Sequence, residues 1–255
     1  GRRPGHHRAR APRSLGEIGM GQGFYRFCRF SLRILFRCTG RVETEDVEKM
    51  PATGPVIVAS NHASYLDPVL LGTYLPRPLH FMARASLFAN PLFGRLIGAL
   101  LAFPVDREGD PRQALRTMGE RLSAGHPVLI FPEGTRTTTG ALQPLKSGVA
   151  MLSTRFRAPI LPVYVKGSFE SWPRGRRLPR PHGYRILAED PLIPESATGG
   201  TGRKAERERL LHDLEAALRA LEQRAWEGET PPRLPSECTE GADETPASEE
   251  RGDIP

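Results

Sequence analysis

Two short polar motifs follow apolar runs of the kind that form buried strands. The first reads Asn-His-Ala-Ser-Tyr-Leu-Asp over residues 61–67 and follows the apolar run at 56–59. The second reads Phe-Pro-Glu-Gly-Thr-Arg over residues 131–136 and follows the run at 128–130. In open α/β sheets, ligands bind outside the carboxyl ends of the strands. The two motifs therefore predict a shared site, with a base on one side and a charged, anion-binding loop on the other.

His62 and Asp67 form the candidate catalytic pair of the first motif. A neutral imidazole accepts a proton from a hydroxyl near neutral pH, and a carboxylate on its far ring nitrogen fixes the tautomer and stabilises the imidazolium. On a regular helix, side chains five residues apart point about 140° away from each other, so the pair requires His62 to precede the helix. The alternative is a buried structural histidine followed by an ordinary N-cap aspartate.

Two other chemistries are disfavoured for the first motif. Ser64 lies close to His62, but the Gly-x-Ser-x-Gly turn of serine hydrolases is missing. We therefore expect Ser64 to contact substrate, together with Asn61, rather than to act as a nucleophile. A zinc site needs more ligands than His62 and Asp67 provide, and we expect neither a metal nor a cofactor.

The second motif offers groups suited to an anion. Gly134 permits a positive φ or a close backbone approach, Thr135 supplies a hydroxyl donor, and Arg136 presents a planar fork that matches phosphate. Glu133 is placed to orient the arginine or to accept from a substrate hydroxyl. The alternative is a structural turn closed by an internal Glu133–Arg136 ion pair.

Further cations stand near other strand ends. The predicted strand at 101–105 is followed by Asp106 and Arg107, and Lys146 precedes a Ser-Gly pair. With Arg136, these residues would place two or three cations near one histidine. Such a cluster fits a phosphomonoester better than a neutral substrate, and it predicts a transferase that activates a hydroxyl of a phosphorylated acceptor.

Alternating strand-like and helix-like segments surround the motifs. Asp67-Pro68 and Asp110-Pro111 each place an N-cap aspartate before a proline at the first helical position, and Gly125 ends the second of these helices. The alternation predicts an α/β fold with a mixed, mostly parallel sheet covered by helices. We expect strands at 55–59, 79–83, 101–105, 127–131, 160–165 and 183–188, with helices between them.

The two ends of the chain differ from this central region. A last amphipathic helix is expected at 203–226, with a flexible Gly-rich lead-in at 199–202. Residues 1–23 and 227–255 lack apolar periodicity and predict a disordered basic N-terminus and a disordered acidic tail. Met20 is the first methionine, so we expect either a natural start there or a missing upstream piece.

Residues 24–40 predict a helix that lies in the plane of a membrane surface. Arg26, Arg29, Arg33 and Arg37 fall along one stripe of a helix, and most of the other residues are apolar. Arginines at the level of the lipid phosphates, with aromatic side chains below them, are typical of interfacial helices. The alternative is a helix packed on the core with a solvated edge.

The net charge, the cysteines and the lengths of the apolar stretches limit the kinds of partner and compartment that fit this chain. The net charge is +7, and residues 1–41 contain ten arginines and one acidic residue. Such a start fits an anionic membrane surface or a nucleic acid, and charge alone does not choose between them. Three cysteines without metal-ligand spacing fit a reducing compartment. The apolar stretch at 96–105 is short of the roughly 20 residues that span a bilayer, so we expect no transmembrane helix.

Four motifs in order resemble those of the glycerophospholipid acyltransferases of the 1-acyl-sn-glycerol-3-phosphate acyltransferase type, which are PlsC-like proteins. The pattern Asn-His-x-x-x-x-Asp is met at 61–67, and Phe-Pro-Glu-Gly-Thr-Arg is met in full at 131–136. An apolar run ending in Asp-Arg matches 103–107, and a proline inside an apolar strand matches Pro162. The resemblance implies an acyltransferase domain at 41–226.

The resemblance implies direct acyl transfer in phospholipid biosynthesis. His62 would be the general base on the sn-2 hydroxyl of lysophosphatidic acid, and Asp67 would orient it. The alkoxide would attack the thioester of acyl-CoA or acyl carrier protein, giving phosphatidic acid. The enzyme would be peripheral or monotopic on the cytoplasmic face of a membrane. The head group would be held by Arg107, Glu133, Gly134 and Arg136.

Other functions remain open to different degrees. The acceptor could instead be glycerol-3-phosphate, another lysophospholipid or an acylated amine, because the motifs constrain the reaction more than the acceptor. A nucleic-acid-binding protein is disfavoured, because the arginines are not interleaved with aromatic residues on a sheet or groove. A non-catalytic lipid-binding relative is disfavoured by the intact His62 and Asp67. The basic, aromatic segment at 168–180 fits membrane phosphates, an acidic carrier protein or a solvated loop.

Overall fold

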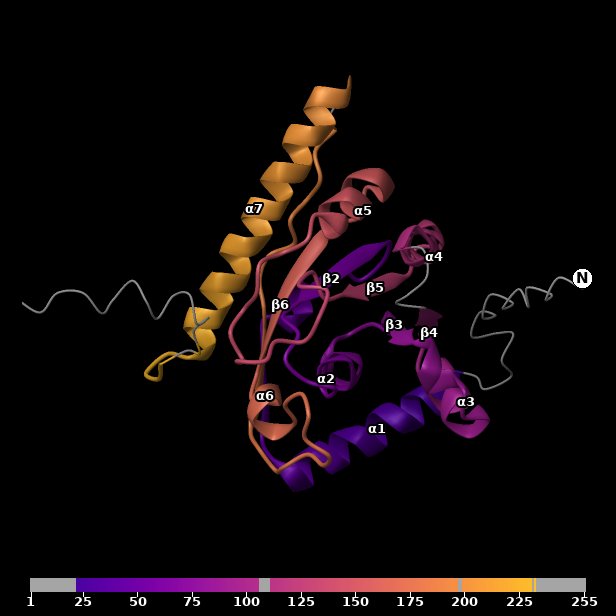
Figure 1. Ribbon diagram of the computed structural model, residues 1–255, viewed down its shortest axis with the longest axis vertical. Coiled ribbons are helices and arrows are strands. Elements are labelled where there is room, and N and C mark those ends of the chain that lie inside the picture. Colours follow the sequence, from indigo (N-terminus) through magenta and orange to yellow (C-terminus); the bar gives the residue numbers. More distant parts are fainter. Residues whose placement is uncertain (1–21, 106–110, 197–198, 231, 233–255) are drawn as a thin grey trace, which may run out of the picture.

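The computed structural model describes residues 22–105, 111–196, 199–230 and 232. They form a central sheet with helices on both faces (Figure 1). The elements in chain order are α1 (Gln22–Thr39), β1 (Val42–Glu45), η1 (Val47–Lys49), β2 (Val56–Ser60), α2 (Asp67–Tyr74), β3 (His80–Arg84), η2 (Ala85–Phe88), α3 (Pro91–Ala99), β4 (Ala102–Val105), α4 (Pro111–Ser123), β5 (Pro127–Ile130), α5 (Gly148–Phe156), β6 (Ile160–Lys166), α6 (Ser168–Ser171), β7 (Tyr184–Ala188) and α7 (Gly199–Ala225).

The sheet has seven strands in the order β1-β7-β6-β2-β5-β3-β4. All neighbouring pairs are parallel except β6 and β7, which are antiparallel. This confirms the predicted α/β fold with a mixed, mostly parallel sheet. Because β2 lies at the centre, its carboxyl end is flanked by those of two parallel neighbours, β5 and β6.

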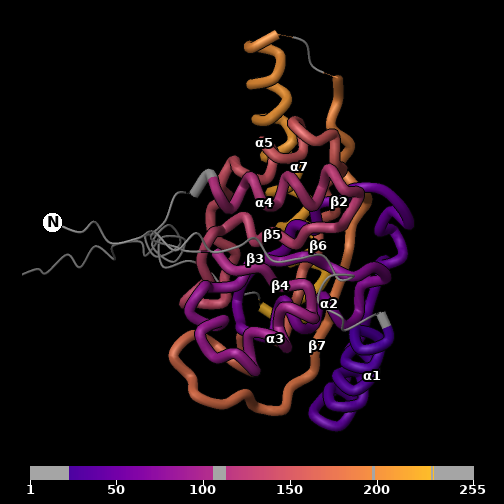
Figure 2. The backbone as a smooth tube through the Cα atoms, turned by 90° about the vertical axis from the view of Figure 1, so that its right-hand side faces the viewer, coloured from indigo at the N-terminus to yellow at the C-terminus, as the bar shows by residue number. Residues whose placement is uncertain are grey.

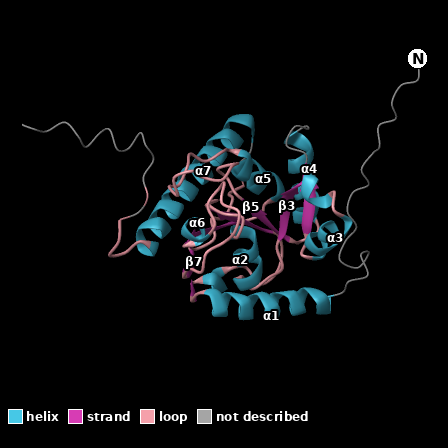
Figure 3. Ribbon diagram, turned by 60° about the horizontal axis from the view of Figure 1, so that its bottom comes forward, coloured by secondary structure: helices cyan, strands magenta, loops and turns pink. Residues whose placement is uncertain are grey.

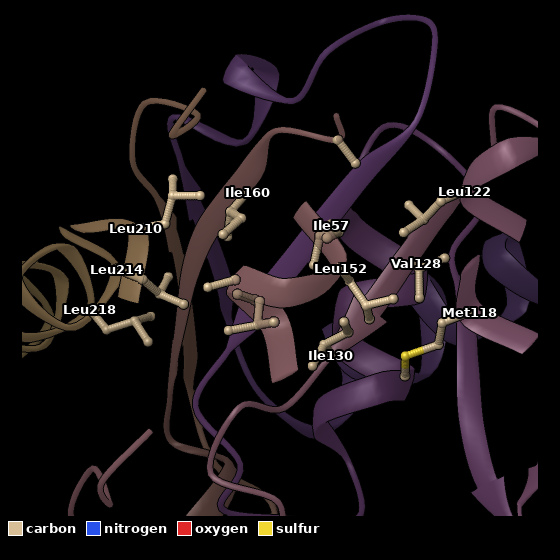
Figure 4. Close-up of a cluster of buried hydrophobic side chains, with 14 of the residues drawn as sticks. Ile57, Met118, Leu122, Val128, Ile130, Leu152, Ile160, Leu210, Leu214 and Leu218 are labelled. Atoms are coloured by element: carbon tan, nitrogen blue, oxygen red, sulfur yellow. The ribbon is translucent and has the colours of Figure 1, made fainter. Parts of the chain in front are cut away.

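Alternate side chains of the central strands feed two apolar cores. Ile57, Val128 and Ile160 face one side, where they pack against α4, α5 and α7 (Figure 4). Val58 and Leu161 face the other side, toward α1 and α2. Both faces of a mostly parallel sheet are covered, so its strands read as continuous apolar runs. The N-terminal end of α7 extends beyond the rest of the fold (Figure 2).

The structure corrects three details of the sequence analysis. β1 was not predicted, because Val-Glu-Thr-Glu is short and its charged side chains lie at the sheet edge, where it pairs with β7. α7 begins at Gly199, so the Gly-rich segment at 199–202 starts the helix instead of leading into it. α1 begins at Gln22, two residues before the predicted boundary. Of the residues predicted to be disordered, 22 and 23 belong to α1 and 227–230 and 232 are placed after the end of α7, whereas 1–21, 231 and 233–255 fall outside the described residues.

The N-cap role predicted for Asp67 is wrong. Asp67 is the first residue of α2, and its carboxylate accepts from backbone N–H groups of the preceding loop rather than from the helix. Pro68, which was predicted at the first helical position, is the second residue of α2 and lies in its first turn. In α4, the predicted cap at Asp110 lies outside the described residues, whereas Gly125 follows the helix end with a φ of 77°, as predicted.

α1 packs on the rest of the fold along one face and is exposed along the other. Its inner face packs on α2, with Tyr25 and Phe36 buried. Arg29 donates to the carbonyls of Thr73 and Leu75, which end α2. α1 lies along one edge of the molecule (Figure 3), and its outer face is exposed. The large apolar side chains exposed on this helix are those of Phe27, Phe30, Ile34 and Leu35, and Arg26, Arg33 and Arg37 are exposed as well.

Within the described residues, no helix is both long and apolar enough to cross a membrane.

Candidate active site

Two neighbouring parallel strands bring the motifs together. β2 and β5 pair in register, with Ala59 opposite Ile130, so the first and second motifs leave the sheet at the same edge. β6 flanks β2 on the other side, where Pro162 lies opposite Ala59. The loop between β2 and α2 thus lies between β5, which leads into the second motif, and β6, which contains Pro162. It stands at the edge of the sheet where ligands of open sheets bind.

His62 and Asp67 are in direct contact. His62 Nδ1 lies 2.8 Å from Asp67 Oδ2, and the same oxygen accepts from the N–H groups of Ala63 and Ser64 at 2.7 and 2.8 Å. His62 precedes α2 and the chain turns before Asp67, which is the geometry the pair requires. The Asp67 side chain is fully buried, whereas that of His62 is 15% exposed. The pair therefore has a buried, hydrogen-bonded acid and an accessible ring.

The imidazole ring is held on a second side by an aromatic face. Phe131 stacks on His62 with ring centroids 3.9 Å apart and an angle of 13° between the rings. An ionised carboxylate only accepts hydrogen bonds, so its contact with Nδ1 favours the tautomer that carries the proton there. That leaves Nε2 as the ring nitrogen that can accept a substrate proton. The contact of Phe131 with the histidine ring was not predicted, although the place of Phe131 inside the second motif was a usable signal.

The backbone of His62 is fixed by the second motif. Its N–H donates to Glu133 Oε1 at 2.6 Å, and its carbonyl accepts from the N–H of Thr137 at 2.9 Å. Glu133 Oε2 accepts from the N–H and the side-chain amide of Gln143 at 3.0 and 3.1 Å. Both carboxylate oxygens of Glu133 therefore accept hydrogen bonds from protein groups, and the side chain connects two loops. Nothing in the sequence pointed to Gln143.

Burial dominates the electrostatics of Glu133. The side chain is 4% exposed, and this desolvation raises the pKa of the carboxyl from 4.5 to about 7, against the three N–H donors that favour the charged form. The neighbouring charge of Asp67 raises the pKa further. Two carboxyl groups therefore support one histidine, one through its ring and the other through its backbone.

The polar side-chain atoms of Asn61 and Ser64 form hydrogen bonds with other groups of the protein. Asn61 donates to the carbonyl of Val165 and accepts from its N–H, at 3.0 and 2.8 Å, which ties the end of β2 to β6. Ser64 Oγ donates to the carbonyl of Trp172 at 2.8 Å and accepts from the N–H of Leu66 at 3.2 Å. Both side chains shape the loop that carries the histidine.

The cations of the second motif gather beside this loop. Gly134 has a φ of 76°, and a Cβ there would meet Lys146 Nζ at 2.5 Å, so glycine suits both the backbone and the lysine. The Arg136 guanidinium carbon lies 3.5 Å from the ring centroid of Tyr65. Arg136 Nη1 is buried and has no hydrogen-bond partner among the described residues. The carbonyl of Thr135 accepts from the Gln143 side chain at 3.4 Å.

Arg107, the remaining predicted phosphate ligand, lies outside the described residues. The internal Glu133–Arg136 ion pair, which would have made the second motif a purely structural turn, does not occur among the described side-chain contacts, because the carboxylate bonds elsewhere. In the described part of the chain, no group of three or more His, Cys, Asp or Glu side chains is placed to hold a metal ion. The arrangement suits proton abstraction from a hydroxyl beside an anion.

Comparison with known proteins places this arrangement in a family. A family model described as Acyltransferase matches residues 41–166. The 1-acyl-sn-glycerol-3-phosphate acyltransferase of Bacillus subtilis (strain 168) is 31% identical over 169 residues, which cover 66% of this chain and 82% of that protein. The human 1-acyl-sn-glycerol-3-phosphate acyltransferase beta is 33% identical over 135 residues, covering 52% of this chain and 48% of that protein.

A solved structure gives the same answer. The crystal structure of the 1-acyl-sn-glycerophosphate acyltransferase PlsC from Thermotoga maritima superposes with a TM-score of 0.62 at 25% identity. The match covers 76% of this chain and 79% of that one. Sequence and fold agree along most of the described chain. This chain belongs to the 1-acyl-sn-glycerol-3-phosphate acyltransferases, a family of acyltransferases.

Proposed function

We propose that this acyltransferase moves a fatty acyl group from a thioester donor to the sn-2 hydroxyl of lysophosphatidic acid, giving phosphatidic acid. The observation that carries the proposal is the His62–Asp67 contact of 2.8 Å at the edge of the sheet, with Arg136 and Lys146 on the adjoining loop. The histidine supplies a base, and the cations supply a site for the acceptor phosphate. The family membership and the names of the relatives agree with this reaction.

Acyl transfer from a thioester needs a group that accepts the proton of the acceptor hydroxyl, and it releases the thiol of the donor. His62 Nε2 takes the proton of the acceptor hydroxyl as its oxygen attacks the thioester carbonyl. The tetrahedral intermediate collapses, the C–S bond breaks, and the imidazolium returns the proton to the thiolate. Asp67 stabilises the imidazolium through Nδ1. Ser64 donates its hydroxyl hydrogen to the carbonyl of Trp172, which fits direct transfer without an acyl-serine.

The remaining residues fall into two groups: those that bind the acceptor phosphate and those that hold the His62 loop in place. Arg136 and Lys146 bind the acceptor phosphate, and Arg107 is proposed as a third cation on the strength of its motif. Gly134 and Thr135 line this loop. Glu133, Asn61 and Ser64, which the sequence analysis assigned to the substrate, instead hold the backbone of the His62 loop, because their polar atoms bond to protein groups.

α1 serves as the contact with the membrane that holds the lipid acceptor. Phe27 and Phe30 are 64% and 63% exposed, and Ile34 continues the same outer face. Helical geometry places Arg26, Arg33 and Arg37 along one border of that face. An apolar face bordered by arginines fits the headgroup layer of an anionic membrane. The protein would then be peripheral or monotopic, on the cytoplasmic side as the sequence predicts.

The decisive experiment is an acyl-transfer assay with purified protein. Acyl-CoA and acyl carrier protein are supplied as alternative donors, because the choice of donor is open. Lysophosphatidic acid, glycerol-3-phosphate, other lysophospholipids and an acylated amine are supplied as acceptors. We expect transfer to lysophosphatidic acid, lost in His62→Ala. Transfer to another acceptor alone would keep the chemistry and overturn the substrate assignment, and no transfer with either donor would overturn both.

A further inference from the structure

Tyr65 lies between two side chains from distant parts of the chain. The guanidinium carbon of Arg136, from the loop after β5, is 3.5 Å from the Tyr65 ring centroid. The ring of Trp172, which follows α6, lies with its centroid 5.4 Å from that of Tyr65 at an angle of 55°. Tyr65 itself belongs to the loop that carries His62 and is 51% exposed. The three side chains form a cluster in which Tyr65 contacts both Arg136 and Trp172.

Arg136 has an aromatic partner where a carboxylate would be expected. Glu133, the nearest acid in the motif, is bonded to His62 and Gln143. Arg136 Nη1 is buried without a hydrogen-bond partner among the described residues. A desolvated donor left unpaired destabilises a protein unless a ligand supplies the acceptor. This cluster therefore holds a cation whose charge is not paired with the nearest carboxylate, and whose buried Nη1 has no partner among the described residues.

Trp172 is itself fixed at both ends. Its carbonyl accepts from Ser64 Oγ at 2.8 Å, and its indole N–H donates to the carbonyl of Arg176 at 2.9 Å. Ser64 and Tyr65 are adjacent in the chain, so one short loop joins the segment after α6 to the base and to the arginine. The indole ring can then act as a fixed backing for Tyr65.

We propose that Tyr65, backed by Trp172, is a positioning residue that holds the Arg136 guanidinium for the acceptor phosphate and thereby favours phosphorylated acceptors. This inference rests on the proposed function, since it requires Arg136 to contact that phosphate. An aromatic face attracts a guanidinium and restrains its plane without neutralising it, and it leaves the edge donors free. A carboxylate partner would orient the same group but would cancel its charge and occupy its donors.

Two substitutions of Tyr65 separate stacking from other roles. Tyr65→Leu removes the ring, and we expect it to raise KM for lysophosphatidic acid about 3- to 10-fold, the range that a lost cation–π contact supports. The values of kcat and of KM for the donor should stay nearly unchanged. Tyr65→Phe keeps the ring face and should behave like the wild type. Monoacylglycerol, the same acceptor without phosphate, should be used equally by all three proteins.

Tyr74→Leu is a matched control. It removes another arginine–tyrosine contact, in which the guanidinium carbon of Arg33 lies 5.8 Å from the ring centroid of the half-buried Tyr74, between α1 and α2. Thermal unfolding of each variant shows whether the fold is retained. In soluble assays with dispersed acceptor, we expect no change in the acceptor KM of this control, because Tyr74 is part of neither motif.

A second readout does not depend on turnover. In a Trp226→Phe background, Trp172 is the remaining tryptophan of the chain. We expect lysophosphatidic acid, but not monoacylglycerol, to change its fluorescence, because binding alters the charge and packing at the adjoining Arg136–Tyr65 contact. Adding Tyr65→Leu should weaken the affinity for lysophosphatidic acid measured by this fluorescence change, again by about 3- to 10-fold.

The outcomes distinguish the inference from the function on which it rests. An unchanged acceptor KM in Tyr65→Leu, or equal losses in Tyr65→Phe and Tyr65→Leu, would overturn the positioning role. The proposed function would survive that result if Arg136→Ala still raised the acceptor KM. If Arg136→Ala also left the acceptor KM unchanged, the phosphate assignment and the role of Tyr65 would both be overturned.

Discussion

The N–H of His62 donates to Oε1 of Glu133 across 71 positions of sequence, at 2.6 Å. This bond joins the two motifs through a backbone group, so the position of the candidate base depends on a residue that never touches its ring. The backbone N–H of Thr137 strengthens this connection, because it donates to the carbonyl of His62 at 2.9 Å. The two motifs are therefore one structural unit, in which the loop after β5 sets the place of the histidine and also carries the arginine.

The raised pKa of Glu133 predicts a pH-dependent stability. The folded-state pKa is about 7, compared with an ordinary value of 4.5, so the native state holds this proton over that interval and the unfolded state does not. Stability from this group is full below the unfolded pKa and is lost as pH rises through the folded pKa. Glu133→Gln removes the titration.

Denaturant unfolding of wild type and Glu133→Gln at a series of pH values tests this. Between about pH 4.5 and 7, the free energy of unfolding of the wild type should fall relative to that of the variant, by up to about 1.4 kcal/mol per pH unit. A difference between the two proteins that stays constant with pH would show that Glu133 is charged throughout this range in the folded protein.

His62→Ala should remove catalysis and leave the fold intact. The ring lies at the edge of the sheet, and removing a general base typically lowers kcat by about 10²–10⁴-fold. Single-turnover transfer with purified protein measures the loss, and circular dichroism with thermal unfolding checks the fold. A folded variant that retained more than about a tenth of wild-type turnover would exclude this general-base role for His62.

Asp67→Asn should reduce kcat by as much as His62→Ala or less. An amide oxygen placed like Oδ2 can still accept from Ala63 and Ser64, so the loop should survive. The neutral amide, however, no longer stabilises the imidazolium or selects its tautomer. The pH–rate profile and kcat are the measurements. Wild-type kcat in the folded variant would leave Asp67 with a purely structural role.

Arg136→Ala should weaken the phosphorylated acceptor selectively. Losing a charge-assisted hydrogen bond typically costs about 1.5–3 kcal/mol, or roughly 10- to 150-fold in acceptor kcat/KM. Lys146→Ala should act in the same direction. Arg203→Ala, on exposed α7, is the charge-matched control. If the KM of the donor rises and that of lysophosphatidic acid does not, the cations bind the donor instead.

α1 should bind anionic vesicles through its outer face. Arg29 holds α2, so the informative variant changes Arg26, Arg33 and Arg37 to Gln and keeps Arg29. Each arginine near an anionic leaflet contributes about 1 kcal/mol, so the triple change should lower vesicle affinity by roughly 100-fold. Co-sedimentation with anionic and neutral vesicles, at low and high salt, measures the effect.

Two further proteins complete the α1 experiment. Changing the exposed Phe27, Phe30 and Ile34 to Ser should weaken binding to both kinds of vesicle, because apolar insertion does not need lipid charge. A control with three exposed cations of α7 changed to Gln should bind normally. If the arginine variant sedimented like the wild type, the membrane contact would lie elsewhere, with the basic segment at 174–180 as the next surface to test. The control positions are Arg203, Lys204 and Arg219.

Local patterns were sufficient for most of the elements. Apolar runs bounded by Gly, Pro and polar residues marked six of the seven strands, because buried parallel strands must be continuously apolar. β1 escaped, because an edge strand can remain polar and short. The start of α7 was misplaced, because three glycines disfavour a helix locally while burial of Leu210 and Leu214 further along stabilises it.

The sequence by itself determined which groups the site would contain: a histidine with a nearby aspartate, and a loop with an arginine. It also predicted that they would meet, because parallel strands share one carboxyl edge. Only the tertiary structure decided which hydrogen-bond partners each group has. Glu133, Asn61 and Ser64 were predicted to contact substrate, and the structure gives each of them a protein partner from another segment, namely His62, Val165 and Trp172. Long-range hydrogen bonds depend on how strands pair and loops pack, and no local pattern encodes those partners.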